Sequence, residues 1–453
     1  MNLKTASMGF DRLSTERVDA ALLYTLTEAE ENGHLCMEKH AFIKACLKLV
    51  DTEGLTMMMT ATRAAKLVEN GQLVSFGKYY VYRAKTAHAE SRLANRIKQF
   101  LRAETGSIPN LDSELRQEED RLGVQFAPEQ REAIKMALSH SLSIITGGPG
   151  TGKTMIQKAI LDIYSRHDPE EKVCCCAPTG RAARRMEDST GFPASTIHRA
   201  LNLMPGEEGG QDSPEPIDAK LVLVDEVSML DVYLANKLLD AVMLGSRLVL
   251  IGDADQLPSV GPGAVLSEMI ASGCVPIVRL DKVFRQEAGS RIAANAKLIR
   301  DGYKTLEWGE DFTFVESPSI AESAEKIVRL YLQEVDKYGL DNVALLTPYR
   351  KKTETGVDAL NARLRDLVNP PSPRKPEAHH GRKAFRVGDK VMQVKNAREV
   401  NNGDVGYIFN ISYGDDVVVQ VDFSGRTVDY STDELALLDW AYASTVHKAQ
   451  GSE

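Results

Sequence analysis

The stretch Ser143–Thr154, SIITGGPGTGKT, constrains this chain more than any other part of the sequence. A short apolar run leads into a glycine-rich turn, and the turn opens into a helical pattern. Gly147, Gly152, Lys153 and Thr154 satisfy the spacing G-x-x-x-x-G-K-[ST] of a phosphate-binding loop. Glycines let backbone N–H groups curl around a polyphosphate, and the following helix N-terminus adds free donors. The sequence therefore predicts an α/β fold with a parallel sheet that binds a nucleotide.

The chemistry of the loop predicts ATP and Mg²⁺ as its ligands. Lys153 is expected to reach the β- and γ-phosphates, and the Thr154 hydroxyl to ligate Mg²⁺. A tight turn without a ligand is the alternative, but the strand before the loop and the helix after it argue against that interpretation. The expected nucleotide contacts are Gly147, Gly148, Pro149, Gly150, Thr151, Gly152, Lys153 and Thr154.

Composition sets the broad class of protein. The chain has 453 residues, of which 43% are hydrophobic and 26% charged, as expected for a globular protein of several domains. No apolar run approaches the about 18 residues of a membrane span, and the N-terminus lacks the apolar core of a signal peptide. We therefore expect a cytoplasmic protein with no membrane partner. The net charge of −9 does not exclude nucleic-acid binding, because the local potential is what a phosphate backbone meets.

An acidic pair adds hydrolysis to nucleotide binding. Asp225 and Glu226 directly follow a buried apolar run of four residues. Asp225 is expected to hold Mg²⁺ through water, and Glu226 to orient and deprotonate the attacking water. Gln256 follows the next apolar strand and is expected to contact both the γ-phosphate and that water. Arg285 is expected to counter charge on the γ-phosphate.

Two regions outside this core have distinct patterns. Residues 1–85 contain three helical patterns followed by a hairpin that turns at Gly77-Lys78, which is typical of a winged-helix-like module. We expect such a module to pack against a partner domain, and contact with DNA is the alternative. From about residue 387 the periodicity switches to two, which predicts a small β-barrel. The proline-rich stretch Asn369–Lys383, shortly before the predicted barrel, is expected to be a linker or mobile loop. Its neighbouring His379 and His380 lack acidic or cysteine partners at the spacing of a metal site.

The chain contains, in order, the motifs GGPGTGKT, APTGRAARRM, STIHRAL, LVLVDEVSML, LIGDADQLPSVGPG, VFRQ, TPYRK and YASTVHKAQGSE. This series resembles the motifs of the superfamily 1 helicases, and of the RecD/TraA family in particular. The resemblance runs from about Ala127 to the end of the chain, and the N-terminal helices and the β-barrel are also similar to the longer bacterial RecD-like proteins.

The resemblance implies a fold with two RecA-like parallel-sheet lobes. The implied N-terminal parts are a helical winged-helix-like module at 1–85 and linking helices at 86–125. RecA-like domain 1 follows at 126–288, with a pin-like loop at 205–218. The first part of RecA-like domain 2 is at 289–368, an SH3-like β-barrel is inserted at 384–435, and the motif V segment of domain 2 is at 436–453.

The resemblance also implies a function. It predicts an ATP-dependent DNA helicase, similar to the α subunit of exodeoxyribonuclease V, that moves 5′ to 3′ on single-stranded DNA in repair or recombination. Its expected partners are single-stranded DNA, junctions of single- and double-stranded DNA, and a single-stranded-DNA-binding protein or repair proteins. Gln130 would read adenine. The residues expected to line the DNA path are Thr179, His198, Arg350, Thr445, His447 and Lys448.

One departure from the family pattern bears on activity. Motif VI of the family supplies an arginine to the γ-phosphate, but no arginine follows Arg426 here. An arginine in that role is worth about 10³–10⁵ in turnover, so we expect this chain to hydrolyse ATP poorly and to be a fragment that ends before motif VI. The alternative function is a nucleotide-dependent DNA-binding module without motor activity. A phosphate-loop kinase and a metal-dependent exonuclease fit the sequence less well.

Overall fold

The computed structural model describes residues 14–203, 214–282, 290–351, 353–397, 400–414 and 416–450. The chain divides into two compact units, of which the first runs to about residue 285 apart from residues 179–185 and the second takes the rest. No helix in these described ranges is long and apolar enough to cross a membrane.

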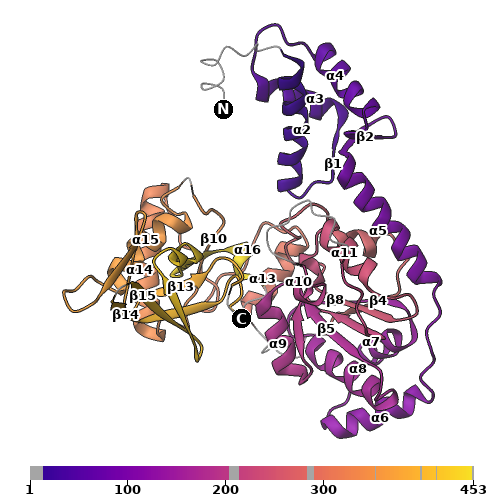
Figure 1. Ribbon diagram of the computed structural model, residues 1–453. Coiled ribbons are helices and arrows are strands. Elements are labelled where there is room, and N and C mark those ends of the chain that lie inside the picture. The colour runs from indigo at the N-terminus through magenta and orange to yellow at the C-terminus, as the bar shows by residue number, and fades with distance from the viewer. Residues whose placement is uncertain are drawn as a thin grey trace. The chain divides into compact units, whose positions relative to one another are not determined.

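A parallel sheet forms the centre of the first unit (Figure 1). Within the described residues it has six strands in the order β6-β5-β7-β8-β4-β9. The two edge strands, β6 and β9, are short, and the sequence pattern did not reveal them. The strands are β4 (Leu142–Gly147), β5 (Val173–Ala177), β6 (Ala194–Thr196), β7 (Leu221–Val224), β8 (Arg247–Gly252) and β9 (Ile277–Leu280).

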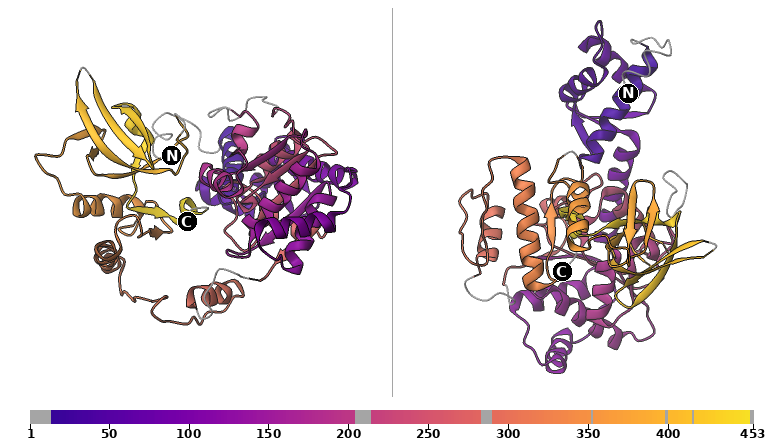
Figure 2. Two further views of the ribbon diagram at one scale, coloured as in Figure 1. Left: turned by 90° about the horizontal axis from the view of Figure 1, so that it is seen from below. Right: turned by 90° about the vertical axis from the view of Figure 1, so that its left-hand side faces the viewer.

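Helices cover both faces of this sheet, as the views in Figure 2 show. Alternate residues of each central strand enter two separate apolar clusters: Val222 and Val224 of β7 belong to one, Leu221 and Leu223 to the other. Burial on both faces explains why these strands are continuously apolar. The helical segments are α5 (Ala84–Arg102), α6 (Leu111–Leu122), α7 (Pro128–Ser139), α8 (Lys153–His167), α9 (Gly180–Thr190), α10 (Ile197–Ala200), η1 (Val227–Met229), α11 (Val232–Ala241) and α12 (Val265–Ala271).

In its described residues, from Ser14 onward, the N-terminal module has three helices and a three-stranded antiparallel sheet in the order β1-β3-β2. Its buried Glu30 accepts a hydrogen bond from Arg83 (2.9 Å) and one from Thr86, and the Thr86 hydroxyl also lies 2.6 Å from that of Tyr233 on α11. A buried, fully paired carboxylate therefore joins the module to the sheet domain. Its elements are α2 (Thr15–Glu31), β1 (Cys36–Glu38), α3 (Lys39–Val50), α4 (Met57–Glu69), β2 (Leu73–Phe76) and β3 (Tyr80–Arg83).

The second unit contains a small parallel sheet and an antiparallel one. Strands β10 and β18 pair in parallel with Thr347 opposite Thr445. Helices α14 and α15 contribute Val328, Tyr331 and Leu360 to the apolar cluster beside them. The elements are α13 (Arg291–Arg300), α14 (Ile320–Tyr338), β10 (Leu345–Thr347), α15 (Val357–Val368), β18 (Ala443–Thr445) and α16 (Val446–Ala449).

The antiparallel sheet is SH3-like and lies between β10 and β18 in the chain. Within the described residues it has five strands in the order β16-β15-β14-β13-β17, so that β17 pairs with β13 beside the residues that lead into β18. Its interior is formed by side chains such as Val391, Val419 and Val421, all fully buried. Its elements are β13 (Lys390–Gln393), β14 (Val405–Tyr413), β15 (Val417–Phe423), β16 (Arg426–Ser431), η2 (Glu434–Leu437) and β17 (Leu438–Trp440).

The stretch expected to be a linker is partly structured. Strands β11 (Glu377–His380) and β12 (Lys383–Arg386) form an antiparallel hairpin with His379 opposite Ala384. The turn between them contains Gly381 at a φ of 58°. The expectation of a linker rested on the prolines before residue 377, whereas the residues after them form the hairpin.

A buried carboxylate anchors the start of the SH3-like sheet. Asp389 has no exposed surface and accepts hydrogen bonds from Arg365 (2.9 Å), from Asn369 (2.7 Å) and from the backbone N–H of Arg386 (2.9 Å). The Tyr442 hydroxyl, on the residue that precedes β18, donates to it at 3.4 Å. One side chain thus ties the entry of the sheet to the segment by which the chain leaves it.

Candidate nucleotide-binding site

The glycine loop lies between β4 and α8, at the carboxyl edge of the parallel sheet. The Lys153 Nζ donates to the carbonyl oxygens of Gly147 (2.6 Å) and Gly148 (3.0 Å), which places its charge over the loop. The Thr151 hydroxyl donates to the Gly148 carbonyl at 2.8 Å and closes the turn from inside. Gly152 has a φ of 87° and directly precedes α8. The loop is therefore shaped by its own backbone, and its cation lies at its mouth.

Gln130 supports the loop from α7. Its Nε2 donates to the carbonyl of Thr151 (3.1 Å), and its Oε1 accepts from the backbone N–H of Ala127 (3.0 Å). Only 5% of Gln130 is exposed. A Cβ on Gly152 would collide with the Gln130 amide, so this contact also requires glycine there. Adenine recognition by Gln130 stays a prediction, and the structure adds a second role in holding the loop.

Gly147 is closely packed and Gly148 is not, so the two neighbouring glycines should differ in how well they tolerate an added side chain. A Cβ on Gly147 would lie 2.8 Å from Leu280 Cβ and 2.9 Å from the Leu280 carbonyl oxygen, whereas a Cβ on Gly148 would have no atom within 4 Å. We expect Gly147→Ala to lower the free energy of unfolding by about 1–3 kcal/mol, because backbone must shift. Gly148→Ala is the matched control and should stay within about 0.5 kcal/mol of the parent. Urea unfolding measures both, and equal losses would contradict this view of the loop.

The acidic pair lies at the same edge of the sheet as the glycine loop. In the parallel register Val224 of β7 is opposite Leu250 of β8, and Gly252 of β8 is opposite Thr146 of β4. Asp225 is therefore level with the last residues of β4 and two strands away, or about 10 Å at ordinary strand spacing. The acidic pair and the glycine loop therefore follow strands that have only β8 between them.

Glu226 has an unusual backbone conformation. Its φ is 52°, in the left-handed region that non-glycine residues rarely occupy, and only 9% of the residue is exposed. Its backbone N–H donates to Asp225 Oδ1 at 2.9 Å, and η1 begins at the next residue. Such strain costs about 1–3 kcal/mol and is typical of functional sites. The hydroxyl of Ser228, two residues later, is buried without a hydrogen-bond partner among the described residues.

The end of β8 brings a third group of polar side chains to this edge. The Thr146 hydroxyl accepts a hydrogen bond from the backbone N–H of Ala254 at 3.2 Å, which joins the end of β4 to the turn after β8. Asp253 is 5% exposed and accepts from the backbone N–H of Asp255 at 3.0 Å. The backbone N–H of Gln256 donates to the Asp253 carbonyl at 3.3 Å. Gln256 thus follows the strand that lies between those carrying the loop and the acidic pair.

Two predicted features fall wholly or partly outside the described residues. Arg285 lies outside them altogether. Of the pin-like loop at 205–218, residues 214–218 are described, and the Ile217 N–H donates to the Ala241 carbonyl at 2.9 Å.

The residues expected on the DNA path include two copies of one local structure. Strand β6 and helix α10 carry the sequence ASTIHRA, and strand β18 and helix α16 carry ASTVHKA. In each copy the threonine caps the short helix: Thr196 accepts from the N–H of Arg199, and Thr445 from that of Lys448, both at 3.2 Å. The repeat is visible in the sequence alone. It adds Arg199, at the position of Lys448, to the candidates.

The strand beside each copy also ends in a similar way. Parallel pairing puts Ala177 of β5 opposite Thr196, and Thr347 of β10 opposite Thr445. Both β5 and β10 are followed directly by proline, in the sequences APTGR and TPYR. Thr179 caps α9 by accepting from the N–H of Ala182 at 3.2 Å. The two units therefore each present a capped helix start and a basic side chain beside a strand–proline turn.

In the second unit the basic side chains gather around one carboxylate. Asp439 accepts from Arg350 (3.0 Å) and from Lys383 (2.7 Å). Burial, together with the positive charge of Arg350, lowers the pKa of Lys448. His447 is exposed on α16. Arg350 also pairs with Asp358 at 3.6 Å, so among these described side chains three cations outnumber two acids by one at this end of β10 and β18.

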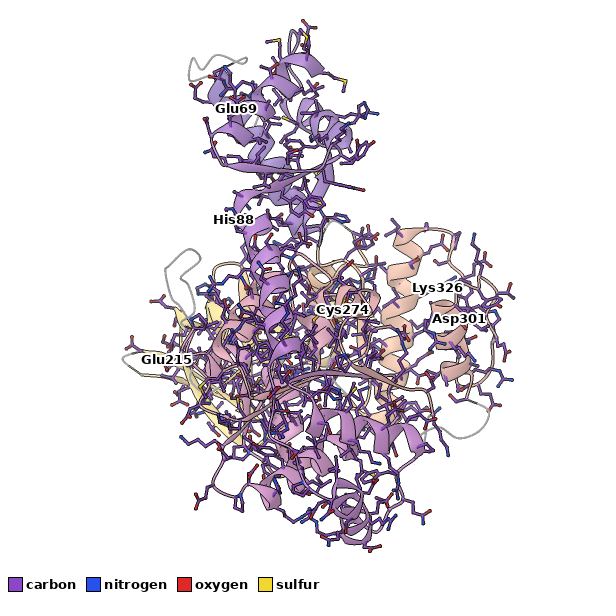
Figure 3. All side chains as sticks on the ribbon, turned by 90° about the vertical axis from the view of Figure 1, so that its right-hand side faces the viewer. Glu69, His88, Glu215, Cys274, Asp301 and Lys326 are labelled. Atoms are coloured by element: carbon purple, nitrogen blue, oxygen red, sulfur yellow. The ribbon has the colours of Figure 1, made fainter. Side chains whose placement is uncertain are left out.

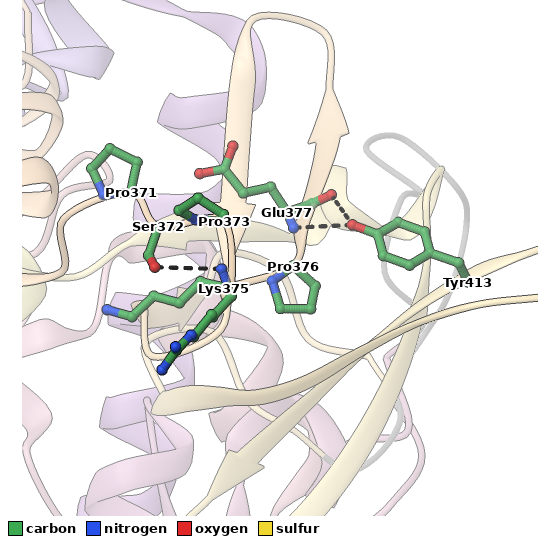
Figure 4. A pocket seen from close by; sticks show the side chains of 8 residues that line it. Pro371, Ser372, Pro373, Lys375, Pro376, Glu377 and Tyr413 are labelled. Carbon is green, nitrogen blue, oxygen red and sulfur yellow. Dashed lines mark hydrogen bonds between the residues drawn. The ribbon is translucent and has the colours of Figure 1, made fainter.

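A shallow cavity of about 620 Å³ lies elsewhere in the second unit (Figure 4). Its wall is the proline-rich segment Pro371–Pro376, and the Tyr413 hydroxyl both donates to the Glu377 carbonyl (2.7 Å) and accepts from the Glu377 N–H (3.0 Å). None of the predicted site residues lines it, so the candidate site remains the carboxyl edge of the six-stranded sheet.

Two segments of the chain match known protein families. Residues 130–262 match the family described as "AAA domain", and residues 360–423 match "ATP-dependent RecD-like DNA helicase SH3 domain". A Deinococcus radiodurans protein named "ATP-dependent RecD2 DNA helicase" is 32% identical over 96% of this chain and 60% of its own length. The chain is therefore similar to RecD-like DNA helicases over nearly all of its length. It thus spans about 60% of the length of this curated relative.

Further relatives are similar over a smaller part of the chain. A Mycobacterium tuberculosis protein named "RecBCD enzyme subunit RecD" is 30% identical over 72% of this chain and 62% of its own length. A solved Pif1 helicase from Bacteroides covers 72% of this chain and 84% of its own, with 17% identity and a TM-score of 0.44.

Proposed function

We propose that this RecD-like chain is the ATP-binding and DNA-binding part of a helicase that moves 5′ to 3′ on single-stranded DNA in repair or recombination. One observation carries the proposal: the Lys153–Thr154 loop and the Asp225–Glu226 pair lie at the same edge of one parallel sheet. The name of the Deinococcus relative supports the activity. The direction of movement is inferred from the family.

The oxygen ligands at this edge suit Mg²⁺ with ATP. A threonine hydroxyl and a carboxylate are the hard ligands that Mg²⁺ takes together with phosphate oxygens. Thr154 would ligate the metal directly and Asp225 through water. Glu226 would orient and deprotonate the attacking water, while Lys153, Gln256 and Arg285 would stabilise charge on the γ-phosphate.

The repeated local structure supports a second RecA-like lobe. Strand β18 and helix α16 have the same sequence pattern and helix cap as β6 and α10. We propose that each lobe holds the DNA backbone at this place, through Thr179, His198 and Arg199 in one and Arg350, Thr445, His447 and Lys448 in the other. Contacts to phosphates fix register without reading sequence, as a translocating enzyme requires.

A nucleotide-dependent DNA-binding module without motor activity is the second candidate for the 453 residues taken alone, which contain no arginine after Arg426. A chain without an arginine finger could hold DNA in a nucleotide-dependent way and turn ATP over slowly. For these residues alone we expect slow turnover that single-stranded DNA stimulates weakly. Single-stranded-DNA-binding protein and repair proteins remain proposed partners.

Two assays test the proposal. Steady-state ATP hydrolysis with and without single-stranded DNA should give slow turnover, and brisk stimulated turnover would contradict the expected dependence on a motif VI arginine. Strand displacement on duplexes with either a 5′ or a 3′ tail, at enzyme excess, should favour the 5′ tail. A preference for the 3′ tail would overturn the direction. Binding of DNA without ATP-dependent displacement of either duplex would favour the non-motor function.

A further inference from the structure

The hairpin of the N-terminal module presents aromatic rings to solvent at its tip. Phe76 is 67% exposed, Tyr79 66% and Tyr80 46%. In the β2–β3 ladder Phe76 is directly opposite Tyr80, so the two rings share one face, and Tyr79 lies in the turn. We refer to Phe76, Tyr79 and Tyr80 as the wing face. Figure 3 shows the module, in which Glu69 is labelled at the end of α4. His88, also labelled, lies on α5, the helix that follows the module.

The core of the module does not need these rings. Leu73 and Val81, on the opposite face of the hairpin, are 1% and 4% exposed and belong to the apolar cluster of the three helices. Phe76 makes one ring contact in the described residues, edge-to-face with Tyr82 at 6.4 Å. Three large exposed rings at one tip are unfavourable in water unless they bind something.

Charge at the tip is predominantly positive. Lys78 is exposed in the turn, and the backbone N–H of Lys39 donates to the Tyr79 carbonyl at 2.7 Å, which fixes the start of α3 beside it. The carboxylate of the neighbouring Glu38 caps the start of α3, where it accepts hydrogen bonds from the N–H groups of His40 (3.1 Å) and Ala41 (2.9 Å). Glu38 keeps its negative charge in this cap, so Lys39, Lys78 and Glu38 together carry one net positive charge beside the rings.

We propose that the wing face binds single-stranded nucleic acid by stacking bases on its rings, with Lys39 and Lys78 near the phosphates. Gly77 and Lys78 separate Phe76 from Tyr79, and such a small, polar gap between flat rings suits stacking on individual bases better than it suits a continuous apolar protein interface. Stacking accepts every base, so the site would hold DNA without sequence preference. It is separate from the strand ends at which the proposed motor holds DNA, and it does not require ATP.

Equilibrium binding of a fluorescent oligothymidylate to the whole chain tests the proposal. Phe76→Ala and Tyr79→Ala should each weaken affinity about 5- to 100-fold, the range for loss of one stacked base. Tyr303→Ala, which removes a ring that is 63% exposed in the second unit, is the control and should leave affinity unchanged. Because these side chains are exposed, thermal unfolding of all three variants should match the parent.

A strand that lacks bases separates stacking from charge. An abasic strand of equal length keeps every phosphate, so the parent should bind it about as weakly as the Ala variants bind the normal strand. In Tyr79→Trp, indole fluorescence should be quenched by oligothymidylate but not by the abasic strand. Equal binding of both strands, or no change in the Ala variants, would overturn the proposal and leave the face to a protein partner.

This test is independent of the proposed motor. The wing variants should retain ATP hydrolysis at saturating DNA, while Lys153→Ala should retain base stacking. If the parent failed to bind Mg·ATP while quenching stayed intact, the motor proposal alone would be contradicted. If quenching were absent while the parent still bound Mg·ATP, the wing-face proposal alone would be contradicted.

Discussion

Replacing Glu226 with glutamine is expected to slow ATP hydrolysis about 10²–10⁴-fold, the usual contribution of a general base. Glutamine has the same shape and keeps the left-handed backbone of the strand end, but it cannot accept the proton of the attacking water. Nucleotide affinity should be nearly unchanged, because Asp225 and Thr154 supply the proposed metal ligands. Single-turnover hydrolysis of labelled ATP at enzyme excess measures the rate even where turnover is slow.

The matched control for this variant is Glu268→Gln on α12, which removes an exposed carboxylate of the same unit that has no proposed role. It should hydrolyse ATP at the parental rate. Parental hydrolysis by Glu226→Gln would assign the base to another group, and failure to bind ATP would instead show that Glu226 shapes the pocket.

Lys153→Ala is expected to reduce hydrolysis about 10²–10³-fold, as for loss of one preorganised donor to developing charge. Unlike the previous variant it should also weaken Mg·ATP binding, because the ammonium group at the loop mouth is lost. Thermal unfolding with increasing Mg·ATP measures this directly, since a ligand that binds only the folded state raises the melting temperature. The parent should show the rise, and the variant should not.

Lysine also holds the loop, so a second pair of variants separates the two roles. Lys153→Arg keeps the charge but replaces a compact ammonium with a planar fork, and should restore some affinity without restoring hydrolysis. Lys158→Ala on the same helix removes a side chain that donates to the Thr190 carbonyl at 3.0 Å, and should bind Mg·ATP normally. Normal binding by Lys153→Ala would refute the assignment of the loop.

The sequence was most informative where one short stretch decides the geometry. Residues 143–154 gave the strand, turn and helix in order, because glycine conformations and a fixed lysine admit few alternatives. The run before Asp225 and Glu226 was continuously apolar, because helices cover both faces of the sheet. These patterns also led to the family assignment that the comparisons support.

Contacts distant in the chain could not be predicted in the same way. Nothing local indicates that Gln130 would donate to Thr151, or that Glu226 would adopt a positive φ, since both depend on packing across the sheet. Edge strands of three or four residues, such as β6, carry too little pattern to detect. The hairpin at Glu377–Arg386 was hidden by the prolines before it, and the repeated ASTxHxA segment required a comparison of the chain with itself.

The buried carboxylate of Asp389 has a mechanical consequence. The same side chain is hydrogen-bonded to Arg365 and Asn369 near the entry of the SH3-like sheet and to Tyr442 near its exit. The sheet is therefore held at both ends of the insertion and is not joined to the rest of the unit by flexible linkers alone. A load applied to the sheet would pass within three residues to Thr445. The inserted sheet can therefore act as a lever on the strand end that the proposed motor uses to grip DNA.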